Sequence, residues 1–266
     1  MTPLDSPTAT TSAPEAVAAH DLREPSELMP VLELGATRTS HRWSEMPGNW
    51  DRLNTRALFD SDNLWGIPNL PATTFEPARL VAYNARHECA AAGPGAAVHF
   101  FLDDYRFETV WSKPERGLSR CQLVGAALTP DFSLWSNMPR VMQLWQVYRS
   151  RWCGAWLLHH GITVVPTVSW STPDSYAFAF AGLPSGSVVA VSTVGTRRDP
   201  EARALFAAGM AAMLEQLQPA TVLVYGTEPT EQVAADVAAA GAVMRVYPSR
   251  WDGRSRTTRT AVAGGR

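Results

Sequence analysis

Seven short apolar runs, separated by stretches with helical periodicity, constrain the fold of this chain more than any other feature. The runs are rich in Val, Leu, Ile and aromatic residues, and they are continuous rather than alternating, a pattern typical of strands buried on both faces. Such strands form parallel sheets, whose strands are connected by crossover helices. The runs are 80–84, 97–102, 123–128, 162–170, 187–192, 221–225 and 243–247.

The helical stretches carry their own start and stop signals. Residues 139–160 begin with Pro139 and are followed by Gly161, and their apolar side chains recur at helical spacing. We expect this apolar face to point to the core; its members are Val141, Leu144, Trp145, Tyr148, Trp152 and Trp156. The other predicted helices begin at Asp199 and near Thr230, and shorter ones cover 86–92 and 114–121.

The alternation of strand and helix predicts an α/β fold with about seven parallel βα units. Right-handed crossovers place the C-terminal ends of all the strands at the same edge. Units this short suit an incomplete or distorted (βα) barrel, and an open doubly wound parallel sheet is the alternative. Pro166 favours the curved barrel, because a proline within a flat central strand would cost a ladder hydrogen bond.

The two ends of the chain differ from its centre in composition and in charge. Residues 1–41 carry six acidic residues against two arginines, whereas residues 249–266 carry five arginines against one aspartate. Neither end has the apolar periodicity of a segment that packs in a core. We therefore expect a disordered tail at 1–41, a single α/β domain at 42–248, and a basic flexible tail at 249–266 that could contact nucleic acid.

Several classes of protein are not supported by the sequence. The apolar runs are broken well before the roughly 18 residues of a membrane span, and no signal-peptide pattern is present, so a cytoplasmic location and no membrane contact are expected. The three cysteines have no C-x-x-C spacing, which argues against a disulfide framework or a zinc site. The chain also lacks the G-x-S-x-G, Walker and G-x-G-x-x-G motifs.

The tripeptide Thr-Pro-Asp follows a predicted strand twice, at 129–131 and at 172–174. Proline suits the first position of a helix, a preceding threonine can cap it, and a following aspartate favours its positive end, so each copy could be a simple strand-to-helix junction. The second copy favours that interpretation, because apolar residues of a short packed segment follow it. Asp131 is different, since no helix begins before Pro139, and it is the stronger candidate for a site carboxylate.

Acidic side chains also follow the strand 97–102, at the same predicted edge. Adjacent residues of an extended strand point to opposite sides, so one of Asp103 and Asp104 can face a site, and we favour Asp104. Carboxylates gathered there could hold a divalent cation such as Mg²⁺ or Mn²⁺, or supply an acid of raised pKa beside an ionised partner. The catalytic candidates are Asp103, Asp104, Asp131 and Asp174.

Hydroxyl and aromatic side chains share this edge, where parallel α/β folds bind their ligands. We expect an unknown small-molecule or phosphate-containing ligand there. Trp170 could form the floor of its pocket or could cap the core instead. The candidate ligand-binding residues are Arg106, Glu108, Ser133, Trp170, Ser171, Ser192, Thr193 and Tyr225.

Five segments of the chain share one family resemblance. They are H-F-F-L-D-D-Y-R-F-E (99–108), L-T-P-D-F-S (128–133), P-T-V-S-W-S (166–171), V-A-V-S-T-V-G (189–195) and V-L-V-Y-G (222–226). Together they resemble a bacterial family of domains of unknown function, whose members occur in actinobacteria and other Gram-positive bacteria, often in phage or integrative-element neighbourhoods. The resemblance covers roughly residues 62–226, and it implies an association with mobile elements but no particular activity.

Two hypotheses of different classes follow. The first is an enzyme with its site at the C-terminal edge of the strands, such as a metal-assisted hydrolase or a phosphate-ester enzyme that uses the aspartates. The second is a non-catalytic regulatory module of a mobile element that binds nucleic acid or a protein. Its contacts would come from the basic tail and from Arg149, Arg151, Arg197 and Arg198.

Overall fold

The computed structural model describes residues 54, 57–196 and 199–249. Strands and helices alternate along the chain, as the sequence predicts. The strands are β1 (Arg79–Ala82), β2 (Ala96–His99), β3 (Ala126–Leu128), β4 (Thr163–Val165), β5 (Val188–Ser192), β6 (Thr221–Tyr225) and β7 (Val243–Tyr247). The helices are α1 (Arg86–Ala90), α2 (Thr109–Ser112), α3 (Pro114–Gln122), α4 (Arg140–His159), α5 (Tyr176–Ala179), α6 (Pro200–Leu217) and α7 (Glu231–Ala239), with 3₁₀ turns η4 (Asp104–Arg106) and η5 (Pro173–Ser175).

The strands form two parallel sheets with the orders β1-β2-β3-β4 and β5-β6-β7. Both orders are sequential, whereas a doubly wound sheet reverses its order near the centre. The sheets meet after β4, where the amide of Val168 donates to the carbonyl of Ala190 at 2.8 Å and the Ala190 amide donates to that of Pro166 at 2.8 Å. The expected α/β class with parallel strands is confirmed; within the described ranges β7 does not pair with β1, so a seven-unit barrel is not confirmed.

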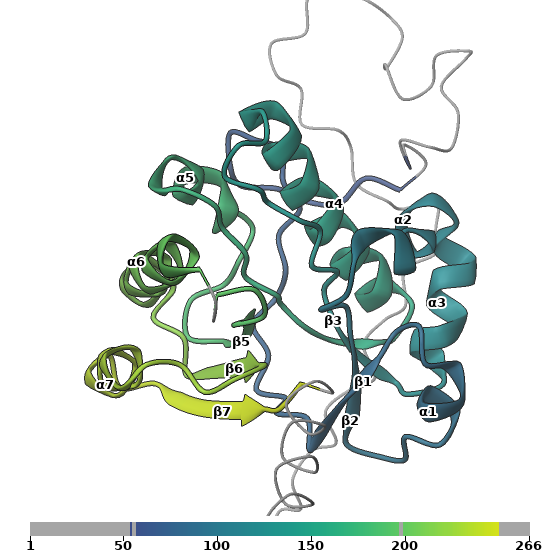
Figure 1. Ribbon diagram of the computed structural model, residues 1–266. Helices are drawn as coiled ribbons and strands as arrows, with labels where there is room; N and C mark the ends of the chain where they lie inside the picture. Colours follow the sequence, from purple (N-terminus) through teal and green to yellow (C-terminus); the bar gives the residue numbers. More distant parts are fainter. Residues whose placement is uncertain (1–53, 55–56, 197–198, 250–266) are drawn as a thin grey trace, which may run out of the picture.

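The helices lie on the outer faces of the sheets. In Figure 1, α6 and α7 lie outside β5, β6 and β7, and α1 and α3 lie outside β1 and β2. The predicted start of α6 is confirmed, because the Asp199 side chain accepts a hydrogen bond from the Glu201 amide at 2.9 Å and Pro200 takes the first helical position. Thr230 caps α7 in the same way by accepting from the Val233 amide at 3.4 Å.

The space between the two sheets is filled by side chains rather than by solvent. On the inner face of β2, the His99 ring lies 4.4 Å from the Tyr225 ring of β6, and Phe101 stacks on Tyr225 at 5.0 Å. The strands are therefore buried on both faces, as their continuous apolar runs predict. The inner cluster comprises Ala97, Phe101, Ala126, Leu128, Val165, Val188, Ala190, Leu223 and Tyr225.

Helix α4 follows its predicted bounds, but its apolar face is covered over only part of its length. Trp152 is 1% exposed, whereas Val141 is 71% exposed and Trp145 is 39% exposed, so the expectation that the whole face points to the core is wrong. The reason is one of length. Twenty helical residues span about 30 Å, whereas the three residues of β3 span roughly 10 Å. The first turns of α4 therefore extend beyond the sheet.

Three further expectations concern the cysteines, the membrane and the tails. Cys89, Cys121 and Cys153 are buried free thiols, as their spacing suggests. In the described ranges, every helix is too short or too polar to cross a membrane. The predicted tail at 1–41 lies outside the described residues, and so does the basic tail apart from Ser249.

Helix α6 has a glycine at the point where it meets Trp170, and this contact yields a prediction. A Cβ atom on Gly209 would lie 2.0 Å from Nε1 of Trp170, which donates to the carbonyl of Leu205 at 3.1 Å. We expect Gly209→Ala to lower the free energy of unfolding by about 1–3 kcal/mol, although alanine favours a helix by about 1 kcal/mol over glycine. Urea unfolding measures this, with Ala211→Gly as the control for propensity alone; a more stable Gly209→Ala variant would contradict the packing.

Candidate functional site

The first Thr-Pro-Asp copy extends the pairing of β3 with β4 instead of starting a helix. The amide of Thr129 donates to the Val165 carbonyl at 3.0 Å. In return, Thr167 donates its amide to Oγ1 of Thr129 at 2.9 Å and its hydroxyl to the Thr129 carbonyl at 2.7 Å. Two residues further along both segments, the Ser169 hydroxyl donates to the carboxylate of Asp131. The extended pairing thus places Asp131 beside the end of the neighbouring strand.

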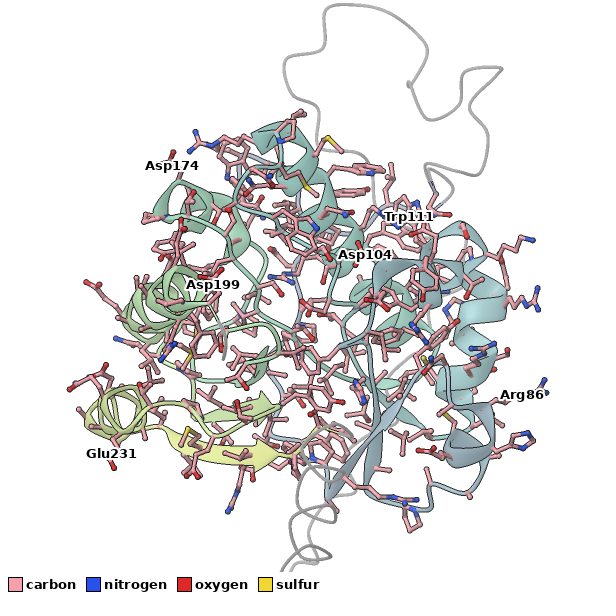
Figure 2. The ribbon with its side chains drawn as sticks, in the orientation of Figure 1. Arg86, Asp104, Trp111, Asp174, Asp199 and Glu231 are labelled. Carbon is pink, nitrogen blue, oxygen red and sulfur yellow. The ribbon has the colours of Figure 1, made fainter. Side chains whose placement is uncertain are left out.

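A second carboxylate, Asp104, reaches the same region from η4. Its oxygens accept hydrogen bonds from the Ser133 amide at 3.2 Å, from the Ser133 hydroxyl at 2.8 Å and from Nε2 of Gln146 at 3.4 Å. Figure 2 shows Asp104 beside α4, the helix that supplies Gln146. The Asp104 carboxyl group is thus held in place from both the β3–α4 loop and helix α4.

The two carboxyl groups lie in unlike environments. Burial raises the pKa of Asp131 to about 6; the hydrogen bond from Ser169 opposes this increase, and the charge of Asp104 adds to it. Asp131 therefore holds a proton far more tightly than an ordinary aspartate, while Asp104 is surrounded by donors. Two carboxyl groups in such different environments can take separate roles, one as an acid and the other as a base.

A small cavity lies beside this pair, between α4 and the ends of β3 and β4. It offers about 10 Å³ to the centre of a water molecule, which is room for roughly one water. Its lining combines apolar and polar side chains, and neither Asp104 nor Asp131 is among them; the lining residues are Pro130, Phe132, Leu134, Gln146, Val147, Ser150, Arg151, Thr167 and Ser169. A ligand larger than water does not fit this cavity.

Arg149 is directed into the protein rather than toward solvent. It forms an ion pair with Glu108, donates to Oε1 of Gln146 at 2.9 Å, and holds its guanidinium 3.9 Å from the ring centre of Phe132. Glu108, which the sequence suggests as a ligand-binding residue, is thus engaged by Arg149. The pair positions Gln146, whose amide donates to Asp104.

Arg151 is also buried, at 2% exposed. Its guanidinium donates to the carbonyls of Thr167 at 3.1 Å and Ala179 at 2.8 Å, and burial lowers its pKa to about 9. It therefore ties α4 to the segments that follow β4 and η5. The hypothesis that Arg149 and Arg151 contact nucleic acid is wrong, because α4 turns both side chains inward.

Two of the four candidate aspartates do not join the pair. Asp103 forms an exposed ion pair with Arg106 at 2.9 Å, and Asp174 forms one with Arg140 at 3.4 Å. In Figure 2, Asp174 lies at the periphery of the molecule. Across residues 54, 57–196 and 199–249, groups of three or more His, Cys, Asp or Glu side chains that could hold a metal ion are absent.

Trp170 and Ser171 serve local packing after β4. The Trp170 ring packs 5.7 Å from that of Phe206 on α6, so it caps the second core rather than the cavity. The Ser171 hydroxyl donates to Oε1 of Gln143 at 2.5 Å, which fastens this segment to α4.

The candidates after β5 and β6 also have local partners. The Thr193 hydroxyl donates to the carbonyl of Thr227 at 2.8 Å, and the Ser192 hydroxyl accepts from the Val194 amide at 3.1 Å. Tyr225 belongs to the inner cluster. These residues stabilise the loops at the edge of the second sheet, whereas the carboxylate pair belongs to the first.

Two residues of the site, Ser169 and Gln146, are absent from the candidates that the sequence suggests. A signal for each exists in the chain. Ser169 follows Thr167 by two positions, and Asp131 follows Thr129 by two positions. The register that pairs Thr129 with Thr167 therefore also pairs Asp131 with Ser169. Gln146 belongs to a polar stripe on α4 with Gln143 and Ser150, at the spacing i, i+3 and i+7.

Comparison with known proteins identifies the family. Residues 59–244 match the family described as "Domain of unknown function (DUF4417)", so the chain belongs to it. It is 49% identical to the "Gene 1 protein" of Mycobacterium phage L5 over 223 residues, and this aligned region covers 83% of this chain and 94% of the phage protein. It is also 49% identical over 228 residues to the "Gene 1 protein" of Mycobacterium phage D29, covering 85% and 83%. No solved structure matches the chain significantly.

The raised pKa of Asp131 predicts how stability depends on pH. The folded protein binds this proton more tightly than the unfolded chain does. The free energy of unfolding therefore falls as the pH rises from about 4 to about 6, and this contribution is constant at higher pH. The shift from 3.8 to about 6 corresponds to about 3 kcal/mol. We expect Asp131→Asn to lack this loss in urea unfolding from about pH 4 to pH 7.5, and Asp174→Asn to keep it. Parallel profiles of the wild type and Asp131→Asn would contradict the assignment.

Proposed function

We propose that this phage-related protein is an enzyme whose reaction centre is the pair Asp104 and Asp131. In this proposal, Asp131 donates and accepts a proton, Asp104 is its ionised partner, and the reaction is the hydrolysis of a phosphate ester or a related bond. The observation that carries the proposal is the raised pKa of Asp131 beside a second carboxylate that has three donors of its own. A group with a pKa near 6 exchanges protons efficiently near neutral pH.

The position of the pair supports this proposal, if both sheets are parts of one incomplete barrel. The sequential strand orders and the bridge at Ala190 favour such a barrel. Side chains also span the gap between β7 and the segment before β1: Arg245 binds Glu76 at 3.1 Å, and the Tyr247 hydroxyl donates to the Pro77 carbonyl at 2.5 Å. Enzymes with this architecture carry their reacting groups at the C-terminal edge of the strands, where Asp104 and Asp131 lie.

A phosphate ester needs positive charge at the site, and the described arginines of α4 do not offer it. Arg149 is paired with Glu108, and Arg151 is committed to carbonyl groups. A divalent cation such as Mg²⁺ or Mn²⁺ would supply the charge, and Mg²⁺ commonly binds through one or two carboxylates and several waters. Asp104 would be the carboxylate ligand of such a cation, with waters as the other ligands, while Asp131 keeps the acid–base role.

The enzyme proposal predicts a division between the aspartates. Hydrolysis of model phosphate monoesters and diesters, assayed with and without millimolar Mg²⁺ or Mn²⁺, should fall by about 100-fold or more in kcat for Asp104→Asn and Asp131→Asn, since a positioned acid or base contributes about 10²–10⁴-fold. Asp174→Asn should retain the activity, because its carboxylate is exposed and bound to Arg140.

Thermal melts of the same proteins provide the control for the cation. A cation bound only by the folded state raises the melting temperature of the wild type, and Asp104→Asn should abolish this rise. Equal activity in all three variants would contradict the proposal. Activity without any response to the cation would contradict only the role of the metal ion.

The second candidate is a module that binds nucleic acid through the basic tail. It is favoured by the five arginines of residues 249–266 and by the phage origin of both relatives. Affinity for double-stranded DNA should then fall steeply with salt concentration and weaken when residues 250–266 are deleted, because phosphate contacts release counterions. Fluorescence anisotropy between about 50 and 200 mM salt tests this; binding that is absent or independent of salt would exclude this candidate.

A further inference from the structure

The apolar stripe of α4 changes from buried to exposed along the helix. The stripe runs through Val141, Trp145, Tyr148, Trp152 and Trp156, which recur at helical spacing and so share one side of the helix. Trp152 is 1% exposed and packs in the main core, whereas Trp145 is 39% and Val141 71% exposed. The first two turns of α4 therefore present an apolar surface that the described residues leave uncovered.

The covered half of the stripe owes its cover to the chain that precedes β1. Nε1 of Trp152 donates to the carbonyl of Ala57 at 2.7 Å, and the Phe59 ring meets the Trp152 ring edge-on at 5.8 Å. Residues 57–59 thus lie across the indole of Trp152.

Asn54, the described residue that precedes Ala57, is held beside Trp111. Its side-chain amide donates to the carbonyl of Trp111 at 3.0 Å. The centre of the Trp111 ring lies 5.2 Å from that of Trp152 and 5.3 Å from that of Trp145. Asn54 is therefore bound to a residue that contacts both the covered and the exposed part of the stripe.

The residues just before Asn54 have the composition of a segment that packs on an apolar surface. Trp43, Met46, Trp50 and Leu53 recur at the spacing i, i+3, i+7 and i+10. Val141 lies only four residues before Trp145, or about 6 Å along the helix. The eleven residues 43–53 are ample for that distance, since each extended residue spans about 3.3 Å.

We propose that residues 43–53 of this chain dock on the exposed part of the α4 stripe, Val141 and Trp145, and on the adjoining exposed side chain of Met142. The position of Asn54 beside Trp111 and the apolar spacing of residues 43–53 identify the occupant as this segment rather than a second copy or another protein. Docked there, the segment lies against the N-terminal end of α4, which adjoins the loop that carries Ser133 and reaches Asp104. The folded domain then begins near residue 43, and residues 1–40 are dispensable to it.

Hydrogen exchange of the full chain, read by mass spectrometry, tests the docking. We expect the amides of residues 43–53 to exchange at least about ten-fold more slowly than in a free peptide of the same sequence. Val141→Asp should abolish this protection, and it leaves the rest of the fold intact because the side chain is 71% exposed. The matched control is Leu123→Asp, whose side chain is 48% exposed just after α3 and which should keep the protection.

A truncation pair supplies the second measurement. Deleting residues 1–40 should leave the melting temperature unchanged, whereas deleting residues 1–53 should lower it. The docking is overturned if residues 43–53 exchange at the rate of the free peptide in the wild type, or if both substitutions remove the protection alike. It is also overturned if the protection appears only at concentrations where sedimentation shows a dimer, because the occupant is then a second copy.

Discussion

The constraint on which this structure depends is that short parallel strands must be covered on both faces. Helices cover the outer faces, and the two sheets cover each other's inner faces through the cluster in which His99 of β2 meets Tyr225 of β6 at 4.4 Å. Apolar side chains of this cluster fill the inner faces. Polar groups that are to meet solvent or substrate are therefore confined to the strand ends.

The carboxylate pair follows from how β3 and β4 end. Pro166 has no amide hydrogen, so the regular ladder stops, and the hydroxyl groups of Thr129 and Thr167 continue the pairing in its place. That continuation sets Asp131 against Ser169, inside the cover that α4 provides. The fold thereby keeps a carboxyl group where ionisation is costly, beside a second carboxylate whose donors come from Ser133 and Gln146. Parallel α/β proteins bind their ligands at this edge, so the unfavourable ionisation of Asp131 there favours a functional role over a structural one.

Much of the fold could be predicted because each signal is local. Continuous apolar runs identify the strands, and Pro200 and Thr230 fix helix starts through groups within one turn of themselves. Asp104 lies inward and Asp103 is exposed, as the sequence favours, but the turn η4 rather than strand alternation separates them. Periodicity, however, shows which residues of a helix share a face and not what covers that face. The exposure of Val141 could therefore not be inferred from the sequence.

The same limit applies to the partners within the site. The inward turn of Arg149 and Arg151 depends on Glu108 and on carbonyl groups from distant parts of the chain. The contact between Asp131 and Ser169 depends on the register of two strands that are 38 residues apart. Strand register is set by long-range packing, so the sequence predicts the edge at which the carboxylates lie but not which of them meet.

The central claim is that burial raises the pKa of Asp131 to about 6, and that the charge of Asp104 adds to this increase. The most direct test is a ¹³C NMR titration of the aspartate carboxyl carbons in the full chain, with the Asp131 resonance assigned from the spectrum of Asp131→Asn. The account predicts that this carboxyl group titrates near pH 6, and at a lower pH in Asp104→Asn, where the neighbouring charge is removed. A midpoint near 3.8, the ordinary value for an aspartate, or a midpoint that does not respond to Asp104→Asn, would contradict it.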